Sequence, residues 1–248
     1  MIDIHMHVIP RIDDGSCSIE MSEEMLKMAV SQGVDTIITT SHSEAFAKNE
    51  KEVKDNYQKI KDLISSKKIP VKVYLGSEVY CEAGNMDAVI EHLTAGRIPS
   101  MNGTKYVLTE FYEVMRENAF YCVERLLAEG WIPILAHVER YLSLDIPSIK
   151  MLKEKGCLVQ LNVYSVCEES QEIIRERARK MLEENLADFM GSDAHRTTHR
   201  PPAVEKGIAY LYENYEKEYV DRILFQNAEE MLVKWEGNCN KSKIRIKL

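Results

Sequence analysis

The chain has 248 residues, of which 45% are hydrophobic, and its 40 acidic and 32 basic side chains give a formal net charge of −8. This length can bury one substantial core, whereas the acidic balance argues against a nucleic-acid-binding protein. No apolar run is long enough to span a membrane, no secretory signal precedes the first strand, and six scattered cysteines form no Cys-x-x-Cys pair. We therefore expect a cytoplasmic protein without a disulfide framework or a thiolate zinc site.

Strand-like and helix-like segments alternate along the whole chain. The first strand covers residues 2–8, and β-branched or apolar runs predict further strands at residues 34–40, 71–80, 105–111, 132–136, 158–163 and 187–190. Helical spacing and glycine stops predict helices at residues 19–32, 50–66, 86–93, 116–128, 147–155, 172–185, 204–215 and 219–235.

This alternation predicts an α/β fold with a parallel sheet. Seven strand–helix units in succession favour a closed or nearly closed TIM-like (β/α)7 barrel, distorted because one unit is missing. An open doubly wound sheet is the alternative architecture. No linker or shift in composition divides the chain, so residues 1–248 are predicted to be a single domain with a basic tail at 236–248.

Residues of metal-ligand type follow the predicted strands at equivalent positions. On the first strand His5 and His7 stand two residues apart, so both imidazoles project to the same side. The same spacing recurs at Asp193 and His195, after the last strand. The complete set of predicted metal ligands is His5, His7, Asp14, His42, Glu78, Glu110, His137, Asp193 and His195.

Taken singly, each of these residues has a structural explanation, such as a helix cap or a salt bridge across the mouth of the barrel. Five of the seven histidines, however, occupy strand ends, and active sites of such barrels lie where the strands end. Imidazoles and carboxylates gathered at one face would repel one another or stay unpaired unless cations neutralised them. The set therefore predicts a metal centre.

This donor set exceeds what one ion needs, so we expect about two or three divalent ions that share carboxylates. Mixed imidazole and carboxylate ligands without thiolate suit manganese, iron or zinc better than magnesium or calcium. Adjacent divalent ions can hold a bridging hydroxide and clamp an in-line phosphoryl displacement. The metal centre thus favours a phosphoryl-transfer hydrolase.

Two arginines are predicted to bind phosphate. Arg140 follows His137 by three residues in one loop, and Arg200 follows His195 in a loop stiffened by prolines. A guanidinium group is always charged, and its planar fork matches phosphate oxygens. The alternative for each is a surface arginine in an ion pair.

A second phosphatase pattern, Cys-x5-Arg, occurs at residues 239–245. That pattern needs small spacer residues, so that backbone N–H groups converge on phosphate, and a following helix. Here the spacer has no glycine and only three residues follow Arg245. The alternating basic residues of this segment instead indicate a solvated tail or a weak docking strand.

Several motifs, taken together, resemble the PHP (polymerase and histidinol phosphatase) superfamily. These are Ile-Asp-Ile-His-Met-His at 2–7 with Asp-Asp-Gly at 13–15, Thr-Ser-His at 40–42, Gly-Ser-Glu-Val-Tyr at 76–80, Leu-Thr-Glu-Phe at 108–111, Ala-His-Val-Glu-Arg at 136–140 and Gly-Ser-Asp-Ala-His at 191–195. More closely, the chain resembles the CpsB/CapC family of bacterial manganese-dependent protein-tyrosine phosphatases. The resemblance covers almost the whole chain in collinear order.

This resemblance implies a trinuclear site in a distorted seven-stranded β/α barrel. It implies one metal on His5, His7, Glu78 and Asp193, a second on Glu78, Glu110 and His137, and a third on Asp14, His42 and His195. Arg140 and Arg200 match family arginines that bind phosphate. The chain departs from some relatives at residues 141–147 and 196–200, on the rim of the site.

The implied activity is hydrolysis of phosphotyrosine by a metal-bridging hydroxide. The implied partner is a cognate bacterial tyrosine autokinase that controls capsule or exopolysaccharide synthesis. A metal-bound water and His199 are the two proton donors considered for the leaving tyrosinate. A small-molecule phosphatase, such as one for histidinol phosphate, is the alternative enzyme. A catalytically silent, metal-stabilised module that binds the kinase tail is the alternative of another class.

Overall fold

The computed structural model describes residues 1–112 and 115–232. Within these residues the strands form two parallel sheets, in the orders β1-β2-β3 and β4-β5-β6-β7-β8. The strands are β1 Ile2–Met6, β2 Thr36–Thr39, β3 Lys72–Leu75, β4 Glu78–Tyr80, β5 Tyr106–Glu110, β6 Ile132–Leu135, β7 Leu158–Asn162 and β8 Phe189–Gly191. Every pair of neighbouring strands within a sheet is parallel and consecutive in sequence. The predicted α/β fold with parallel strands is confirmed.

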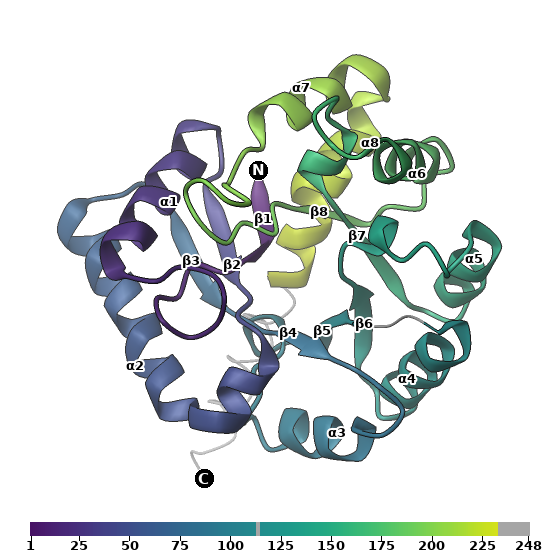
Figure 1. Ribbon diagram of the computed structural model, residues 1–248, viewed down its shortest axis with the longest axis horizontal. Coiled ribbons are helices and arrows are strands. Elements are labelled where there is room, and N and C mark those ends of the chain that lie inside the picture. The colour runs from purple at the N-terminus through teal and green to yellow at the C-terminus, as the bar shows by residue number, and fades with distance from the viewer. Residues whose placement is uncertain (113–114, 233–248) are drawn as a thin grey trace, which may run out of the picture.

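Most helices lie outside the strands, around a common centre, and connect one strand to the next, whereas the last two follow β8 (Figure 1). They are α1 Ile19–Ser31, α2 Ser43–Lys67, α3 Met86–Thr94, α4 Arg116–Ala128, α5 Ile146–Glu154, α6 Glu172–Glu183, α7 Glu205–Asn214 and α8 Lys217–Asp221, which a π-helical segment, Arg222–Gln226, continues. Among the described residues, no helix combines the length and the apolar character that crossing a bilayer requires.

The predicted strand at 71–80 is wrong as a single element, because the structure divides it into β3 and β4. Gly76 lies close to β2, and a Cβ there would stand 3.1 Å from the Ile38 side chain. The Ser77 hydroxyl then donates to the Pro99 carbonyl at 2.6 Å. The chain thus leaves β2, the partner of β3, and joins β5, the partner of β4.

Isolated parallel bridges connect the two sheets at both places where they meet. Met6 bridges Ala194, and His42 bridges Glu78. At the first junction the His7 amide donates to the Ala194 carbonyl at 2.8 Å, and the Asp193 amide donates to the His5 carbonyl at 2.8 Å. Backbone hydrogen bonds therefore hold the ends of β1 and β8 side by side.

The helix predicted at residues 50–66 begins earlier in the structure, because α2 starts at Ser43. Asn49, with φ −156° and ψ 75°, interrupts it, so residues 43–48 form a separate first segment. The closing helix predicted at 219–235 is described as far as residue 232, and its end lies outside the described residues. The same is true of Cys239, Arg245 and the basic tail at 236–248.

An apolar cluster fills the space between the strands below their carboxyl ends. Ile4, Ile38, Leu108 and Ile134 from four strands belong to this cluster together with Met231, one of the last helical residues described. A larger cluster packs the helices against the outside of the strands. The strand ends are thereby fixed on both sides, which holds the side chains that follow them.

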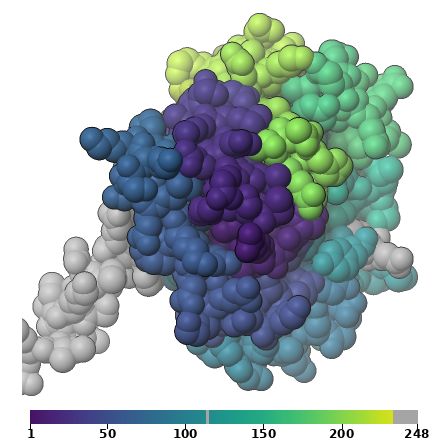
Figure 2. Space-filling model, turned by 60° about the vertical axis from the view of Figure 1, so that its left-hand side comes forward, coloured from purple at the N-terminus to yellow at the C-terminus, as the bar shows by residue number. Residues whose placement is uncertain are grey.

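Two loops that are far apart in sequence close one side of the strand ends. The loop at 10–16 and the segment at 196–203 lie side by side on one face (Figure 2). The Arg196 side chain donates to the Asp14 backbone carbonyl at 3.2 Å. The side-chain amide of Gln32 donates to the Pro202 carbonyl at 2.8 Å. This contact brings the two predicted ligand loops to the same place.

Candidate metal centre

All nine predicted ligands lie together at the carboxyl ends of the strands. Their nitrogen and oxygen atoms form four groups that could each hold an ion, with atoms of a group within 4.8 Å of one another. The groups are His7, Asp14, His42 and His195; His5, His7 and Asp193; His5, Glu78 and His137; and His42, Glu78 and Glu110. These groups share members, so they form one continuous cluster.

The two histidines of β1 converge on one carboxylate. The Nε2 atoms of His5 and His7 lie 3.2 Å apart, and each lies 3.2 Å from Glu78 Oε2. Asp193 Oδ1 lies 3.4 Å from His5 Nε2. The β1–β2 register shifts between Asp3 and Met6, and an irregularity of this kind re-aims side chains. The predicted convergence of the i, i+2 pair is confirmed.

Neighbouring backbone amides determine the tautomers of both rings. The Oε1 atom of Gln160 accepts the His137 amide at 2.9 Å and lies 3.1 Å from His5 Nδ1. Asp13 Oδ2 likewise accepts the His42 amide at 3.1 Å and lies 2.9 Å from His7 Nδ1. Because both oxygens accept, each Nδ1 carries a proton, so Nε2 is the atom of each ring that would be free to bind a metal ion.

On the far side of Glu78 lie His137 and Glu110. Glu78 Oε1 is 2.8 Å from His137 Nε2, while Glu110 Oε1 is 2.8 Å from His42 Nδ1. His42 Nδ1 is also 3.4 Å from Glu78 Oε2. In this geometry Glu110 groups with His42 rather than with His137, unlike the grouping that the family resemblance implies.

In the third part of the cluster, two hydrogen-bond acceptors face each other: the Nε2 atom of His195 and a carboxylate oxygen of Asp14. His195 Nδ1 contacts the Asp193 carbonyl oxygen at 2.8 Å and must donate to it. The opposite Nε2 atom is buried without a hydrogen-bond partner, 3.2 Å from Asp14 Oδ1. Burial and the charges of His7 and Arg200 lower the pKa of His195 to about 3, so the ring is neutral. A lone pair that faces a carboxylate oxygen fits a cation.

Without ions, protons balance the carboxylates elsewhere in the cluster. Burial alone would lower the pKa of His42, but its hydrogen bond to Glu110 outweighs burial and raises the pKa to about 9. Burial also opposes the charged form of His7, yet Asp13 and Glu78 raise its pKa well above the ordinary value. Burial would raise the pKa of Glu78, but neighbouring imidazoles hold it well below the ordinary value.

Both predicted arginines reach the rim of the cluster. Arg140 Nη1 donates to Asp193 Oδ2 at 2.9 Å, and Arg200 Nη2 donates to Asp14 Oδ2 at 2.8 Å. Their side chains are 44% and 34% exposed, respectively. Each arginine forms an ion pair, which was the alternative to phosphate binding. The partner in each pair, however, is a carboxylate of the cluster itself. Each guanidinium group is therefore accessible and next to the metal donors.

The backbone of the site is locally strained. His137, Asp193 and Arg200 have φ values of 35°, 52° and 50°, in the left-handed region that such residues rarely adopt. Gly15 lies so close to β1 that a Cβ there would stand 2.4 Å from the His7 carbonyl oxygen. Positions like these persist only where the surrounding structure holds them.

Sequence reasoning missed three residues that orient the predicted ligands: Asp13, Gln160 and Asn162. Asn162 Nδ2 donates to Asp193 Oδ2 at 3.2 Å, and its Oδ1 accepts from Gln160 at 2.9 Å. Gln160 and Asn162 end β7 with the same i, i+2 spacing as His5 and His7, which was the available signal. Asp13 stood beside Asp14 in the Asp-Asp-Gly motif.

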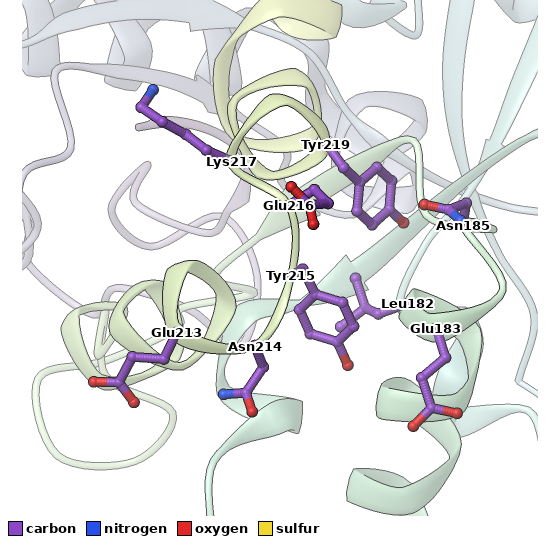
Figure 3. Close-up of a pocket in the computed structure, with 9 residues that line it drawn as sticks. All are labelled: Leu182, Glu183, Asn185, Glu213, Asn214, Tyr215, Glu216, Lys217 and Tyr219. Atoms are coloured by element: carbon purple, nitrogen blue, oxygen red, sulfur yellow. The ribbon is translucent and has the colours of Figure 1, made fainter.

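A separate hollow lies away from the strand ends, between α6 and the turn from α7 to α8 (Figure 3). The hydroxyl of Tyr215 donates a hydrogen bond to the Arg179 carbonyl, and the hydroxyl of Tyr219 donates one to the Ala187 carbonyl. None of the four donor groups found among the described residues includes a residue of this hollow. Among the described residues, the groups that could hold a metal ion therefore lie at the strand ends.

Parallel strands whose carboxyl ends carry groups able to hold metal ions define an α/β protein with a candidate metal centre. A sequence model of the family described as "Capsular polysaccharide synthesis, CpsB/CapC" matches residues 1–233. The chain belongs to this CpsB/CapC family, which confirms the resemblance seen in its motifs.

Similar proteins include the tyrosine-protein phosphatase CpsB of Streptococcus agalactiae, which is 29% identical over 94% of this chain and 98% of its own length. The tyrosine-protein phosphatase YwqE of Bacillus subtilis is 32% identical over 94% of this chain and 91% of its own length. The fold is similar to that of a solved structure, with a TM-score of 0.82. That structure is described as one of the crystal structures of YwqE from Bacillus subtilis and CpsB from Streptococcus pneumoniae, "unique metal-dependent tyrosine phosphatases". That match is 28% identical and covers 94% of both chains.

Proposed function

We propose that this protein is a metal-dependent protein-tyrosine phosphatase, which hydrolyses phosphotyrosine to tyrosine and phosphate. The observation that carries the proposal is the cluster of buried imidazoles and carboxylates with two arginines on its rim. Membership of the CpsB/CapC family and the printed activities of its relatives support it.

We propose that about two or three divalent ions occupy the cluster, with manganese preferred and iron or zinc as alternatives. The donors would be His5, His7, Asp14, His42, Glu78, Glu110, His137, Asp193 and His195. The unpartnered Nε2 of His195 and the converging Nε2 atoms of His5 and His7 support this fit. When bound, such ions neutralise phosphate charge and acidify water.

The protein's own side chains would bind and orient the phosphate. Arg140 and Arg200 donate to Asp193 and Asp14, respectively. The oxygens of a phosphate dianion could accept further hydrogen bonds from the same two guanidinium groups. A guanidinium group aimed at the non-reacting oxygens stabilises charge that develops during displacement. The leaving tyrosinate, with a conjugate-acid pKa of about 10, needs less proton assistance than an alkoxide. His199, exposed in the same loop as Arg200, stays one proposed donor.

The test is the turnover of three phosphate esters by purified, manganese-loaded protein: a phosphotyrosyl peptide, histidinol phosphate and p-nitrophenyl phosphate. We expect the peptide to be preferred and a chelator to abolish all turnover. Preference for histidinol phosphate would make the protein a small-molecule phosphatase. Peptide binding without any turnover would make it a silent binding module.

The finer architecture and biology are part of the same proposal. We propose that residues 1–248 are one domain and that the two sheets close into one distorted barrel of seven strand–helix units, which the bridges between the sheets support. We propose a bacterial tyrosine autokinase of capsule or exopolysaccharide synthesis as the partner, and the cytoplasm as the location. Phosphotyrosine levels of the co-produced kinase, with and without this protein, test the partner.

A further inference from the structure

A groove of about 860 Å³ lies beside the cluster, at the ends of β4 and β5. Two of its lining residues follow predicted metal ligands by two positions: Tyr80 follows Glu78, and Tyr112 follows Glu110. Tyr112 also lines the hollow that contains Asp14 and His42. The groove and the mouth of the cluster are therefore continuous across one tyrosine ring.

The groove has an aromatic wall that is open to solvent. The rings of Tyr80 and Tyr112 are stacked, with centroids 4.2 Å apart and an interplanar angle of 17°. Tyr112 is 62% exposed, and Tyr121 lines the same groove and is also exposed. Large exposed apolar side chains that gather around a groove mark a contact surface.

The same groove carries negative charge. Glu82 and Glu117 line it, and its described lining residues include no lysine or arginine. The hydroxyl of Tyr80 donates to Glu82 Oε2 at 2.7 Å, and that of Tyr112 donates to Glu44 Oε1 at 3.0 Å. Aromatic faces next to carboxylates attract cations, especially a guanidinium group that can stack on a ring.

We propose that this groove binds the polypeptide segment next to the phosphotyrosine and selects substrates with arginine or lysine in that segment. The inference rests on the proposed function, because the phosphotyrosine would occupy the adjacent cluster. An extended peptide advances about 3.3 Å per residue, so a residue about two positions away clears the ring of Tyr112. The negative charge and the aromatic wall supply the complementarity that argues for a cationic occupant.

The experiment compares phosphotyrosyl peptides that differ at one position, about two residues before or after the phosphotyrosine, where each carries arginine, norleucine or glutamate. Free phosphotyrosine is the substrate that cannot reach the groove. With the full-length, manganese-loaded protein, we expect the arginine peptide of one series to have a KM about three- to tenfold below that of the glutamate peptide. Values of kcat should agree within the series.

Charge-neutral variants locate the preference. Glu117→Gln and Glu82→Gln should reduce the preference for arginine, whereas turnover of free phosphotyrosine stays at the wild-type level. Glu129→Gln is the matched control, because Glu129 is exposed at the opposite end of α4 from Glu117. This control should keep the preference unchanged.

Equal KM values for arginine and glutamate peptides in both series, with free phosphotyrosine still hydrolysed, would overturn this inference and leave the proposed function intact. The chain's own basic tail is the competing occupant. A full-length Lys241→Gln, Lys243→Gln variant that lowers KM equally for every peptide would assign the groove to that tail and overturn the proposal. Failure to hydrolyse any phosphotyrosine compound would instead refute the proposed function, and this inference with it.

Discussion

A chain of three hydrogen bonds connects a predicted ligand of β1 to one that follows β8. His5 Nδ1 donates to Gln160 Oε1 at 3.1 Å, Gln160 Nε2 donates to Asn162 Oδ1 at 2.9 Å, and Asn162 Nδ2 donates to Asp193 Oδ2 at 3.2 Å. The amide of Gln160 can take only one orientation, because its oxygen also accepts the His137 amide. The side-chain amide of Gln160 therefore helps to orient two predicted metal ligands, His5 and Asp193, that are distant in sequence.

Gln160→Leu should weaken manganese binding about 10- to 100-fold, because it removes a partner that orients a ligand. Stability should fall by about 1–3 kcal/mol, since two buried donors lose their acceptor. Manganese titration measures the affinity, and long-range ¹⁵N–¹H spectra report the tautomer of His5. Gln58→Leu is the matched control, because Gln58 is exposed on α2. Wild-type manganese affinity in Gln160→Leu would contradict this role.

Arg140→Lys should lower kcat/KM for phosphotyrosyl peptide by about 10- to 100-fold, although the positive charge is kept. A lysine is a point donor and cannot reproduce a planar fork. Manganese content should not change, because the arginine is not among the predicted metal ligands. Arg125→Lys, in a surface pair with Asp87, is the control. Wild-type turnover by Arg140→Lys would mean that Arg140 serves only its ion pair with Asp193.

At the scale of elements, the junction of β1 with β8 determines how closely the ligands approach. A Cβ at Gly191 would stand 2.8 Å from His5 Cβ and 3.1 Å from Gln160 Nε2. Only glycine allows the end of β8 to pack this closely against β1. The glycine thus sets the distance between the first histidine pair and Asp193.

Gly191→Ala should therefore separate the two strands and lower stability by about 1–3 kcal/mol, as overpacking of a rigid core does. Manganese affinity should fall with it. Thermal unfolding and manganese titration measure both effects. Gly84→Ala is the control, because the nearest atom to its added Cβ is the flexible Glu82 side chain at 3.9 Å. An unchanged unfolding temperature for Gly191→Ala would show that the junction tolerates a methyl group.

For the whole molecule, ions and protons compete for the same cluster. The hydrogen bond between His42 and Glu110 outweighs burial and raises the pKa of His42 to about 9, against an ordinary value of about 6.5. In metal-free protein the charged form of His42 therefore contributes stability below about pH 6.5, and that stability is lost as pH rises toward 9. A metal ion needs the neutral ring, so its binding releases protons.

We accordingly expect the unfolding temperature of metal-free protein to fall between pH 6.5 and pH 9. The increase caused by excess manganese should grow over the same interval, because fewer protons compete for the donors. Calorimetric scans with chelator and with manganese, at several pH values, measure both trends. His42→Gln provides the comparison in which this contribution is absent. A manganese effect that shrinks with rising pH would refute the competition.

Local patterns in the sequence were sufficient to place the nine predicted ligands at strand ends. The i, i+2 spacing of His5 with His7 is a property of strand geometry, and parallel strands have their carboxyl ends at one edge. The alternation of strands and helices determined the α/β fold for the same reason, because local periodicity reports which residues face a core.

Only the tertiary structure decided which residues orient the ligands and where the groove lies. His5 meets Gln160 across 155 residues of sequence, and no local period records such a meeting. The division of residues 71–80 into β3 and β4 depends on Gly76 packing against Ile38 and on Ser77 bonding to Pro99. The stacking of Tyr80 on Tyr112 depends in turn on the pairing of β4 with β5. These contacts form between elements distant in the chain, so only the assembled fold decides them.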